Sequence, residues 1–202
     1  MAIYAENTGT SREPVEPGTY MGRCYQMIHI GHVLETIQGT EKKLNKVRLG
    51  FELPTELQTN GRPSVLSQEY TLSMSTKSNL RKMLESWRGK KFTDEEAKKF
   101  DITVLLGKPC SITVIVNDKG YENISAITTL MKGTTAPAQI NSTQELNYDE
   151  FNEELFNDLP EFIKEKVKRS DEYTEMVNNK NFPIGKPSEE TGVDENPDDL
   201  PF

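Results

Sequence analysis

The stretch KVRLGFEL (residues 46–53) alternates strictly between two kinds of position. One set is apolar and the other is polar or lacks a side chain: Val47, Leu49, Phe51 and Leu53 in the first, Lys46, Arg48, Gly50 and Glu52 in the second. Successive side chains of a β-strand point to opposite faces, so this stretch predicts a strand with one buried face and one polar, partly basic face. Pro54 is expected to end the strand, because proline cannot donate to a sheet ladder.

Similar alternation on both sides of this stretch predicts four more strands, at residues 19–32, 66–74, 110–116 and 121–128. The first of these has two different faces. We expect one face to carry Gly22, Cys24, Ile28 and Ile30, and the other to carry Arg23, Tyr25, Met27 and His29.

Between the third and fourth predicted strands the apolar period changes to that of a helix. Leu80, Met83, Leu84 and Trp87 lie at i, i+3, i+4 and i+7, so Trp87 is expected in the core. Thr93 with Glu96 has the spacing of a capping box, which predicts a second, short helix.

Three strands, a helical insert and two strands form the element order of the OB-fold, a small Greek-key barrel that binds single strands and oligosaccharides. The expected fold class is therefore mainly β, with a five-stranded OB-fold barrel and a helical insert between strands 3 and 4. Other small β-barrels are the alternative.

The segments outside this predicted barrel differ from it in composition. Residues 1–17 are polar and proline-punctuated, so we expect a mobile N-terminal arm before a barrel domain at residues 18–132. Residues 133–177 are predicted to be a linker followed by an acidic helical segment, and residues 178–202 a disordered acidic tail.

Two helices are predicted in the acidic helical segment. Apolar residues lie near helical spacing at residues 148–159, and Asp158 with Pro160 marks the start of a second helix over residues 160–173. Helices of this length are marginal alone, so we expect them to dock on the barrel, on a second copy or on a partner.

Charge separates the body from its C-terminal part. Residues 1–132 contain 18 Lys or Arg and 15 Asp or Glu, whereas residues 133–202 contain 6 and 17. The net charge of −8 is therefore the sum of a mildly basic body and a strongly acidic C-terminal part. A nucleic-acid ligand for the body remains compatible with this distribution.

Several classes of protein are not expected. Cys24 and Cys110 are far apart and no signal peptide is recognisable, so we expect a cytoplasmic protein. No apolar run approaches the roughly 18 residues of a membrane helix, so no membrane partner is expected. Phosphate-binding glycine loops, nucleophile elbows and helical metal-binding pairs are lacking, so we expect no enzyme and no cofactor.

One combination of residues has the types and number of a zinc site: Cys24, His29, His32 and Cys110. Cys24 and His29 are expected on opposite faces of one strand, so both could reach one ion only across a β-bulge. We therefore expect two buried cysteines without a metal, and an exposed His29.

Sequence-tolerant binding of single strands requires cations for phosphates and flat side chains on which bases stack. The candidate DNA-binding residues are Arg23, Tyr25, His29, Lys46 and Arg48 on the first two strands, Lys77, Arg81 and Lys82 around the first helix, and Lys119 and Tyr121 at the last hairpin. A solvated sheet or helix face is the alternative interpretation of these positions.

Two resemblances support that ligand. The stretches GRCYQMIHIG, VRLGFELP and LRKMLESWRGKKFTDEEAKKFDITVLLGKPCSITV, within residues 18–117, resemble phage-encoded relatives of OB-fold single-stranded DNA-binding proteins. The residues Asp198, Asp199, Leu200, Pro201 and Phe202 resemble the acidic tip of bacterial single-stranded DNA-binding proteins.

The resemblances imply a division of labour. The barrel would coat single-stranded DNA during replication, recombination and repair, in the host cytoplasm if the protein is phage-encoded. The tip would bind a helicase, polymerase, nuclease or recombination factor, with Phe202 in an apolar pocket and the acids steering the encounter.

The chain departs from the bacterial pattern in two respects. Helical acidic segments stand between barrel and tip, and the elements that build the bacterial tetramer are not recognisable, so we expect a monomer or dimer. A protein-interaction adaptor with an OB-like barrel and an RNA-binding OB protein are the alternatives. Exposure of Tyr25 and His29 would favour nucleic acid, and their burial would favour the adaptor.

Overall fold

The computed structural model describes residues 13–181, with side chains through Asn179. The predictions for residues 1–12 and 182–202, including the tip Asp198–Phe202, lie outside the described residues. The described chain forms β1 (Gly18–Ile37), β2 (Thr40–Leu57), β3 (Pro63–Thr71), α1 (Asn79–Arg88), α2 (Asp94–Lys98), the 3-10 helix η1 (Ile102–Leu105), β4 (Pro109–Val116), β5 (Glu122–Thr128), β6 (Gln144–Leu146), α3 (Glu153–Asp158), α4 (Glu161–Lys168) and α5 (Asp171–Asn181).

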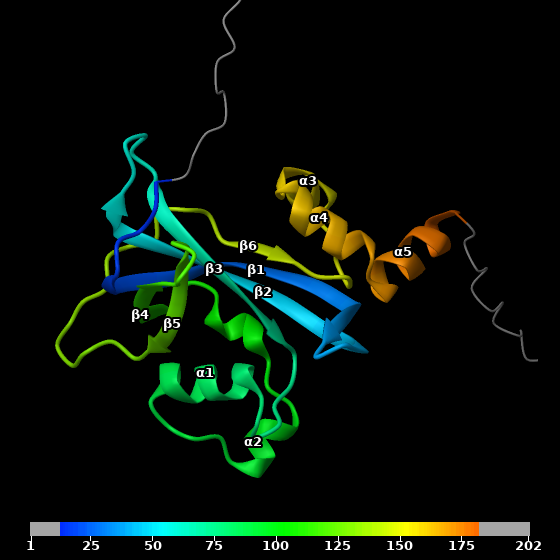
Figure 1. Ribbon diagram of the computed structural model, residues 1–202, viewed down its shortest axis with the longest axis horizontal. Coiled ribbons are helices and arrows are strands. Elements are labelled where there is room, and N and C mark those ends of the chain that lie inside the picture. Colours follow the sequence, from blue (N-terminus) through cyan, green and yellow to red (C-terminus); the bar gives the residue numbers. More distant parts are fainter. Residues whose placement is uncertain (1–12, 182–202) are drawn as a thin grey trace, which may run out of the picture.

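The strands build one open sheet (Figure 1). Five of them pair antiparallel in the order β3-β2-β1-β4-β5, and the short β6 pairs with β1 in parallel. Within the described residues no ladder joins β3 to β5, which leaves a seam between these two edge strands. The mainly β class and the helical insert between the third and fourth strands are confirmed, whereas β6 was not predicted.

β1 and β2 form a hairpin that is longer than the strands predicted at residues 19–32 and 46–53. Its two-residue turn, Gln38 and Gly39, has positive φ at both positions, as a tight hairpin turn requires. The ladder to β3 ends at Lys46 opposite Thr71, so the rest of the hairpin continues as a two-stranded ribbon. The sequence did not indicate this extension because the ribbon is largely exposed, and Val33 is the one buried side chain between residues 32 and 44.

Two irregularities in β1 change which side chains share a face. The register with β2 shifts between Cys24 and Gln26 and again between His29 and Gly31. A bulge adds one residue to a strand and reverses the alternation beyond it. Met27 consequently joins Cys24 in the core at 3% exposure, so the prediction that placed Met27 on the polar face is wrong.

The main core lies between the sheet and α1. Ser78 caps α1 by accepting the Arg81 N–H at 3.1 Å, and the helix buries Leu80, Leu84 and Trp87. Trp87 is 7% exposed and its indole N–H donates to the Pro109 carbonyl oxygen at 2.8 Å. The predicted burial of Trp87 is confirmed, as is the predicted capping box at the start of α2.

The C-terminal segment docks on β1. A second apolar cluster joins Ile28 of β1 to residues of β6, α3, α4 and the connection between α3 and α4: Leu146, Phe156, Leu159, Ile163 and Val167. Figure 1 shows α3 to α5 gathered beside the end of the β1–β2 hairpin. The helix predicted over residues 160–173 is divided at Arg169 and Ser170, because the Ser170 hydroxyl accepts the Tyr173 N–H at 3.1 Å and caps a new helix, α5.

The predicted linker is tied to the sheet by buried polar groups. Arg23 donates to the Pro137 carbonyl oxygen at 2.5 Å. The fully buried carboxylate of Glu52 accepts the N–H groups of Ile140 and Asn141, each at 2.7 Å. A buried carboxylate needs such donors, so the connection follows a fixed course across the sheet.

Order begins before Gly18. Val15, within the predicted mobile arm, is 6% exposed in the main core, and its N–H donates to the Glu122 carboxylate.

Candidate nucleic-acid interface

Two neighbouring hollows lie where the β1–β2 hairpin, β3 and α1 meet. The hairpin groove, of about 640 Å³, is bounded by Lys42 and Leu44 of the hairpin, by the end of β3 and by Lys77 in the loop before α1. The seam groove, of about 300 Å³, lies between β3 and β5 beside α1 and includes Lys82. Both are lined by Gln68, Tyr70 and Asn79, so the two grooves adjoin, and we call them the joined grooves.

Local structure explains why lysines face this surface. Lys42, Leu44 and Lys46 alternate along β2, so they share one face of the ribbon and Lys43 takes the other. Lys77 precedes the N-cap of α1, and Lys82 lies one turn into that helix. Three separate elements therefore bring a lysine to the joined grooves.

The grooves have a surplus of positive charge. Lys42, Lys77 and Lys82 make no ion pair with any residue between 13 and 179. The acids nearby are already paired: Glu35 with Lys46 at 3.0 Å, and Glu69 with Arg48 at 3.3 Å and Lys166 at 2.8 Å. An anionic ligand would meet uncompensated lysines and neutralised acids.

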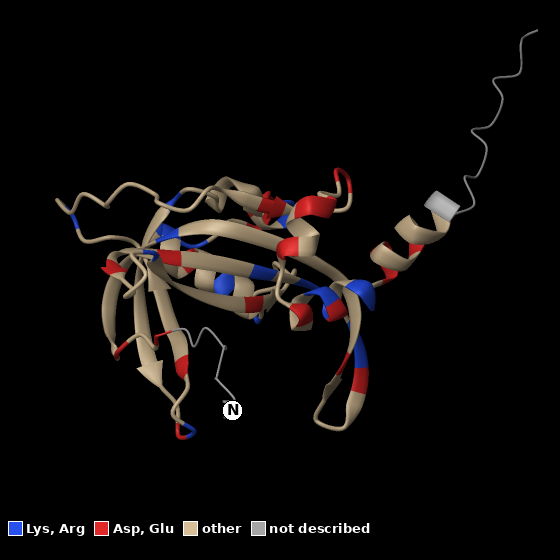
Figure 2. Cartoon of the chain, turned by 90° about the horizontal axis from the view of Figure 1, so that it is seen from above, with Lys and Arg blue, Asp and Glu red and all other residues tan. Residues whose placement is uncertain are grey.

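The β4–β5 hairpin adds an exposed aromatic side chain. Tyr121 is 68% exposed at the start of β5, and Lys119 is exposed in the turn before it. The Asn117 side-chain oxygen accepts the N–H groups of both residues, at 3.0 and 2.9 Å, which fixes the turn. Figure 2 shows the β1–β2 and β4–β5 hairpins projecting from the same side of the body at its two ends.

The residues predicted on the first two strands are engaged in contacts of their own. Arg23 donates to the carbonyl oxygens of Pro137 and Gly107. Arg48 contacts Glu69 and lies 5.3 Å from the ring centroid of Phe162 in α4. Both guanidinium groups therefore hold the C-terminal part of the chain against the sheet.

His29 and Tyr25 are half-buried rather than exposed. His29 shares a hydrogen bond of 2.8 Å with Asn45 and contacts the Tyr148 ring edge-on at 5.3 Å. Arg23 is opposite Glu52 and His29 is opposite Val47, five positions apart on β2, so Arg23 and His29 lie on opposite faces. The expectation of an exposed His29 is wrong, and these residues do not form one open binding face.

The remaining predicted residue, Arg81, serves the fold. It is 8% exposed and donates to the carbonyl oxygens of Met74 and Phe92 and to the Glu85 carboxylate. Of the ten predicted residues, Lys46, Lys77 and Lys82 line the grooves, and Lys119 and Tyr121 lie on the second hairpin.

The residues considered for zinc do not gather. Cys24 and Cys110 are buried in the main core, where desolvation raises the pKa of Cys24 to about 12 and that of Cys110 further. His32 lies 2.6 Å from the Glu172 carboxylate and is not part of the core cluster that contains both cysteines. Among residues 13–181 no group of three metal-ligating side chains is found.

The sequence analysis did not identify two residues that the structure brings forward, Lys42 as a candidate ligand contact and Glu52 as a buried anchor. Lys42 lies in the exposed ribbon, where only the Lys42-Lys43 pair offered a signal. Glu52 was expected on a polar face, yet it is fully buried as the acceptor for Ile140 and Asn141.

No protein-family model matches the chain, and the search of curated proteins found no match. None of the helices within residues 13–181 has the length and apolar character needed to cross a bilayer.

Proposed function

We propose that this chain is a non-enzymatic, sequence-tolerant single-stranded DNA-binding protein with an OB-fold. The observation that carries the proposal is the set of three lysines, Lys42, Lys77 and Lys82, that face the joined grooves and have no acidic partner among residues 13–179. In OB-folds the ligand follows strands 2 and 3 and the loops 1–2 and 4–5. The strand order β3-β2-β1-β4-β5 and the position of the grooves agree with that arrangement.

The proposed chemistry is electrostatic with some stacking. Phosphates would lie along Lys42, Lys77 and Lys82, while Tyr121 offers an exposed ring to a base. The resemblance to phage single-stranded DNA-binding proteins supports a role for this activity in phage DNA replication, recombination and repair. On the same grounds Asp198–Phe202 would recruit replication or recombination proteins.

Oligo-dT binding measured by fluorescence anisotropy at several salt concentrations tests the proposal. Contact with three phosphates predicts a slope of log K against log salt of about −2, from roughly −0.7 per phosphate. Parallel titrations with duplex DNA and RNA of equal length separate single-stranded DNA from the other nucleic acids. Weak binding that does not change with salt would contradict the proposal.

Charge reversal locates the ligand. Lys77→Glu with Lys82→Glu should weaken oligo-dT binding about tenfold or more and flatten the salt slope, because two phosphate contacts are lost and two repulsions added. Arg62→Glu is the control matched in charge to each single substitution, Lys77→Glu or Lys82→Glu, since Arg62 is exposed in the β2–β3 loop, at the opposite end of both strands from the grooves. A loss of affinity in Arg62→Glu equal to that in either single groove variant would show that net charge alone governs binding and would exclude the groove as the site.

An adaptor that binds a polypeptide is the second candidate, favoured by two observations. Tyr25 and His29 are half-buried, and β3 and β5 each leave one edge unpaired within the described residues. An extended peptide could add to either edge through main-chain hydrogen bonds. A peptide ligand would bind without the steep salt dependence that DNA requires, so the same titrations distinguish the two.

A further inference from the structure

The β1–β2 ribbon that forms one wall of the hairpin groove has little support from the sheet. We call residues 32–44 the arm, because the ladder between β2 and β3 ends at Lys46 opposite Thr71. A two-stranded ribbon is only marginally stable by itself in water. Its orientation must therefore be set by contacts from another element.

The arm also departs from the sheet at an irregular point. The register shift between His29 and Gly31 is followed by Gly31 with φ of +94°. Such bulges bend a strand, so the direction of the arm depends on what packs at this position. A Cβ on Gly31 would collide with the Glu172 carboxylate and would lie 2.8 Å from the Ser170 Cβ, which shows how closely α5 approaches.

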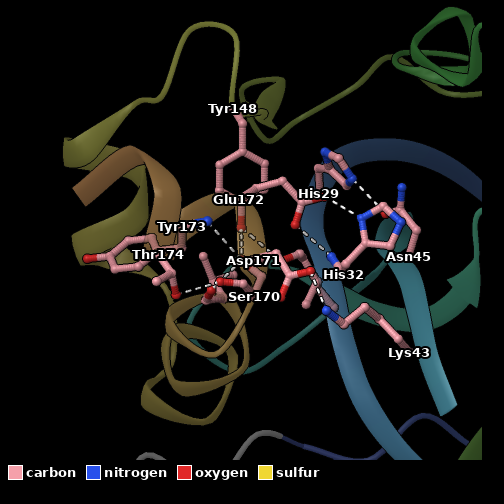
Figure 3. A network of polar contacts seen from close by, with 12 residues as sticks. His29, His32, Lys43, Asn45, Tyr148, Ser170, Asp171, Glu172, Tyr173 and Thr174 are labelled. Carbon is pink, nitrogen blue, oxygen red and sulfur yellow. Dashed lines mark hydrogen bonds and ion pairs between the residues drawn. The ribbon is translucent and has the colours of Figure 1, made fainter. Parts of the chain in front are cut away.

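Glu172 of α5 binds the arm directly at the bulge (Figure 3). One carboxylate oxygen accepts the His32 main-chain N–H at 2.7 Å, and the other lies 2.6 Å from the imidazole Nδ1. The neighbouring Asp171 pairs with Lys43 at 2.7 Å. Within the described residues, these are the hydrogen bonds and ion pairs that join the arm to elements other than β1 and β2.

The start of α5 is itself fixed. Ser170 is fully buried, and its hydroxyl lies 2.8 Å from that of Tyr148, which donates to the Ile30 carbonyl oxygen at 2.8 Å. Tyr148 packs against the second apolar cluster, which rests on Ile28 of β1. Glu172 therefore projects from a rigid base onto the point where the arm bends.

The arm presents its other face to the hairpin groove. Lys43 pairs with α5, whereas Lys42 and Leu44 line the groove from the opposite face of the same strand. We propose that Glu172 is a positioning residue: by holding His32 at the bulge, it fixes the arm so that Lys42 and Leu44 face the groove where single-stranded DNA binds. This inference rests on the proposed function and assigns α5 a role in the affinity of that site.

Glu172→Ala tests this in the full chain, with Glu175→Ala as the control. Glu175 is exposed on the same helix and makes no ion pair with a described residue. Each substitution removes one negative charge near a basic groove, so electrostatics alone would tighten binding of a polyanion in both proteins. The positioning role instead predicts that Glu172→Ala weakens oligo-dT binding about fivefold, because the site loses its preorganisation, and that Glu175→Ala does not weaken it.

Amide hydrogen exchange of the arm is the second measurement. Faster exchange confined to residues 32–44 in Glu172→Ala, with unchanged exchange in β4 and α1, supports positioning rather than general destabilisation. Glu172→Gln, which keeps an acceptor for the His32 N–H, should recover part of both the protection and the affinity.

If amide hydrogen exchange in the arm is unchanged in Glu172→Ala, the inference is wrong. It is also wrong if exchange becomes faster while oligo-dT binding stays the same or becomes tighter. Failure of the unaltered chain to bind oligo-dT would instead overturn the proposed function and the link to the groove. The exchange comparison would then still decide whether Glu172 fixes the arm.

Discussion

The guanidinium of Arg81 is engaged in hydrogen bonds within the protein. From the sequence alone, its position on α1 would suit a contact with phosphate just as well. Its partners are the Met74 and Phe92 carbonyl oxygens, at 3.1 and 3.0 Å, and the Glu85 carboxylate at 2.9 Å. The hydrogen bond from Arg81 is the main reason why the pKa of Glu85 lies below its ordinary value. Sequence cannot separate such a buried arginine from the neighbouring Lys82, which is exposed and free to bind a ligand.

Arg81→Ala should therefore lower stability rather than affinity. Removing the guanidinium leaves two carbonyl oxygens without their donor, at a cost of about 2–3 kcal/mol. Urea unfolding checks the loss, and oligo-dT titration of the folded fraction should match that of the unaltered chain. Lys82→Ala provides the opposite pattern, with stability kept and affinity reduced. Loss of affinity in folded Arg81→Ala would assign Arg81 to the interface after all.

At the scale of secondary-structure elements, the strength of the contact between α5 and the arm is expected to depend on pH. Burial alone would raise the pKa of Glu172, but hydrogen bonds from the His32 main chain and imidazole outweigh it and lower that pKa below its ordinary value. Because this pKa is lower in the folded than in the unfolded protein, the ionised carboxylate stabilises the fold at every pH above the ordinary glutamate pKa of about 4.3. The stabilisation is lost as the pH falls through the pKa of the folded protein.

The matching prediction compares the unaltered chain with Glu172→Gln. The difference in free energy of unfolding should be about 1–2 kcal/mol at pH 7, as for other hydrogen bonds to a charged group. It should shrink as the pH falls below the ordinary glutamate pKa of about 4.3 and through the lower pKa of Glu172 in the folded protein, because protonation removes the charged acceptor. Urea unfolding at pH 7 and pH 3.5 measures both values. A difference that stays constant or grows at acid pH would refute the assigned role of the carboxylate.

Elements with one buried face were predictable, and elements held by tertiary contacts were not. α1 follows from the spacing of Leu80, Leu84 and Trp87, because one helix face is buried. The arm is largely exposed, with Val33 as its one buried residue. The division between α4 and α5 depends on Ser170, whose role follows only from its contact with Tyr148. The bulge between Cys24 and Gln26 could not be predicted from the sequence either. With or without the extra residue, both faces of the strand carry apolar side chains, so the pattern does not show where the alternation reverses.

At the scale of the molecule, charge is distributed between a body with three uncompensated groove lysines and an acidic C-terminal part. Residues 182–202 contain six acids and one lysine and lie outside the described residues. In the acidic helical segment, two carboxylates pair with residues of the β1–β2 hairpin: Asp171 with Lys43 and Glu172 with His32.

Deleting Asp198–Phe202 should leave oligo-dT binding unchanged or make it slightly tighter at low salt. The deletion removes the carboxylates of Asp198 and Asp199, which under the proposed function would compete with phosphate for the groove lysines. Anisotropy titration of the truncated chain at about 50 and 200 mM salt checks this, because competition between charges is screened at the higher concentration. Weaker DNA binding after truncation would contradict the idea that the C-terminal carboxylates compete with DNA phosphates.

The sequence by itself determined the strands with an apolar face, the helix between the third and fourth strands and the segregation of charge, because each of these is a property of neighbouring residues along the chain. Only the tertiary structure decided which cations remain available. Arg23 and Arg48 contact groups distant in sequence, and Arg81 is enclosed by Met74, Glu85 and Phe92. Lys42, Lys77 and Lys82, in contrast, make no ion pair with any residue between 13 and 179. Whether a charge binds a ligand or its own fold depends on its neighbours in space, and a linear pattern does not contain them.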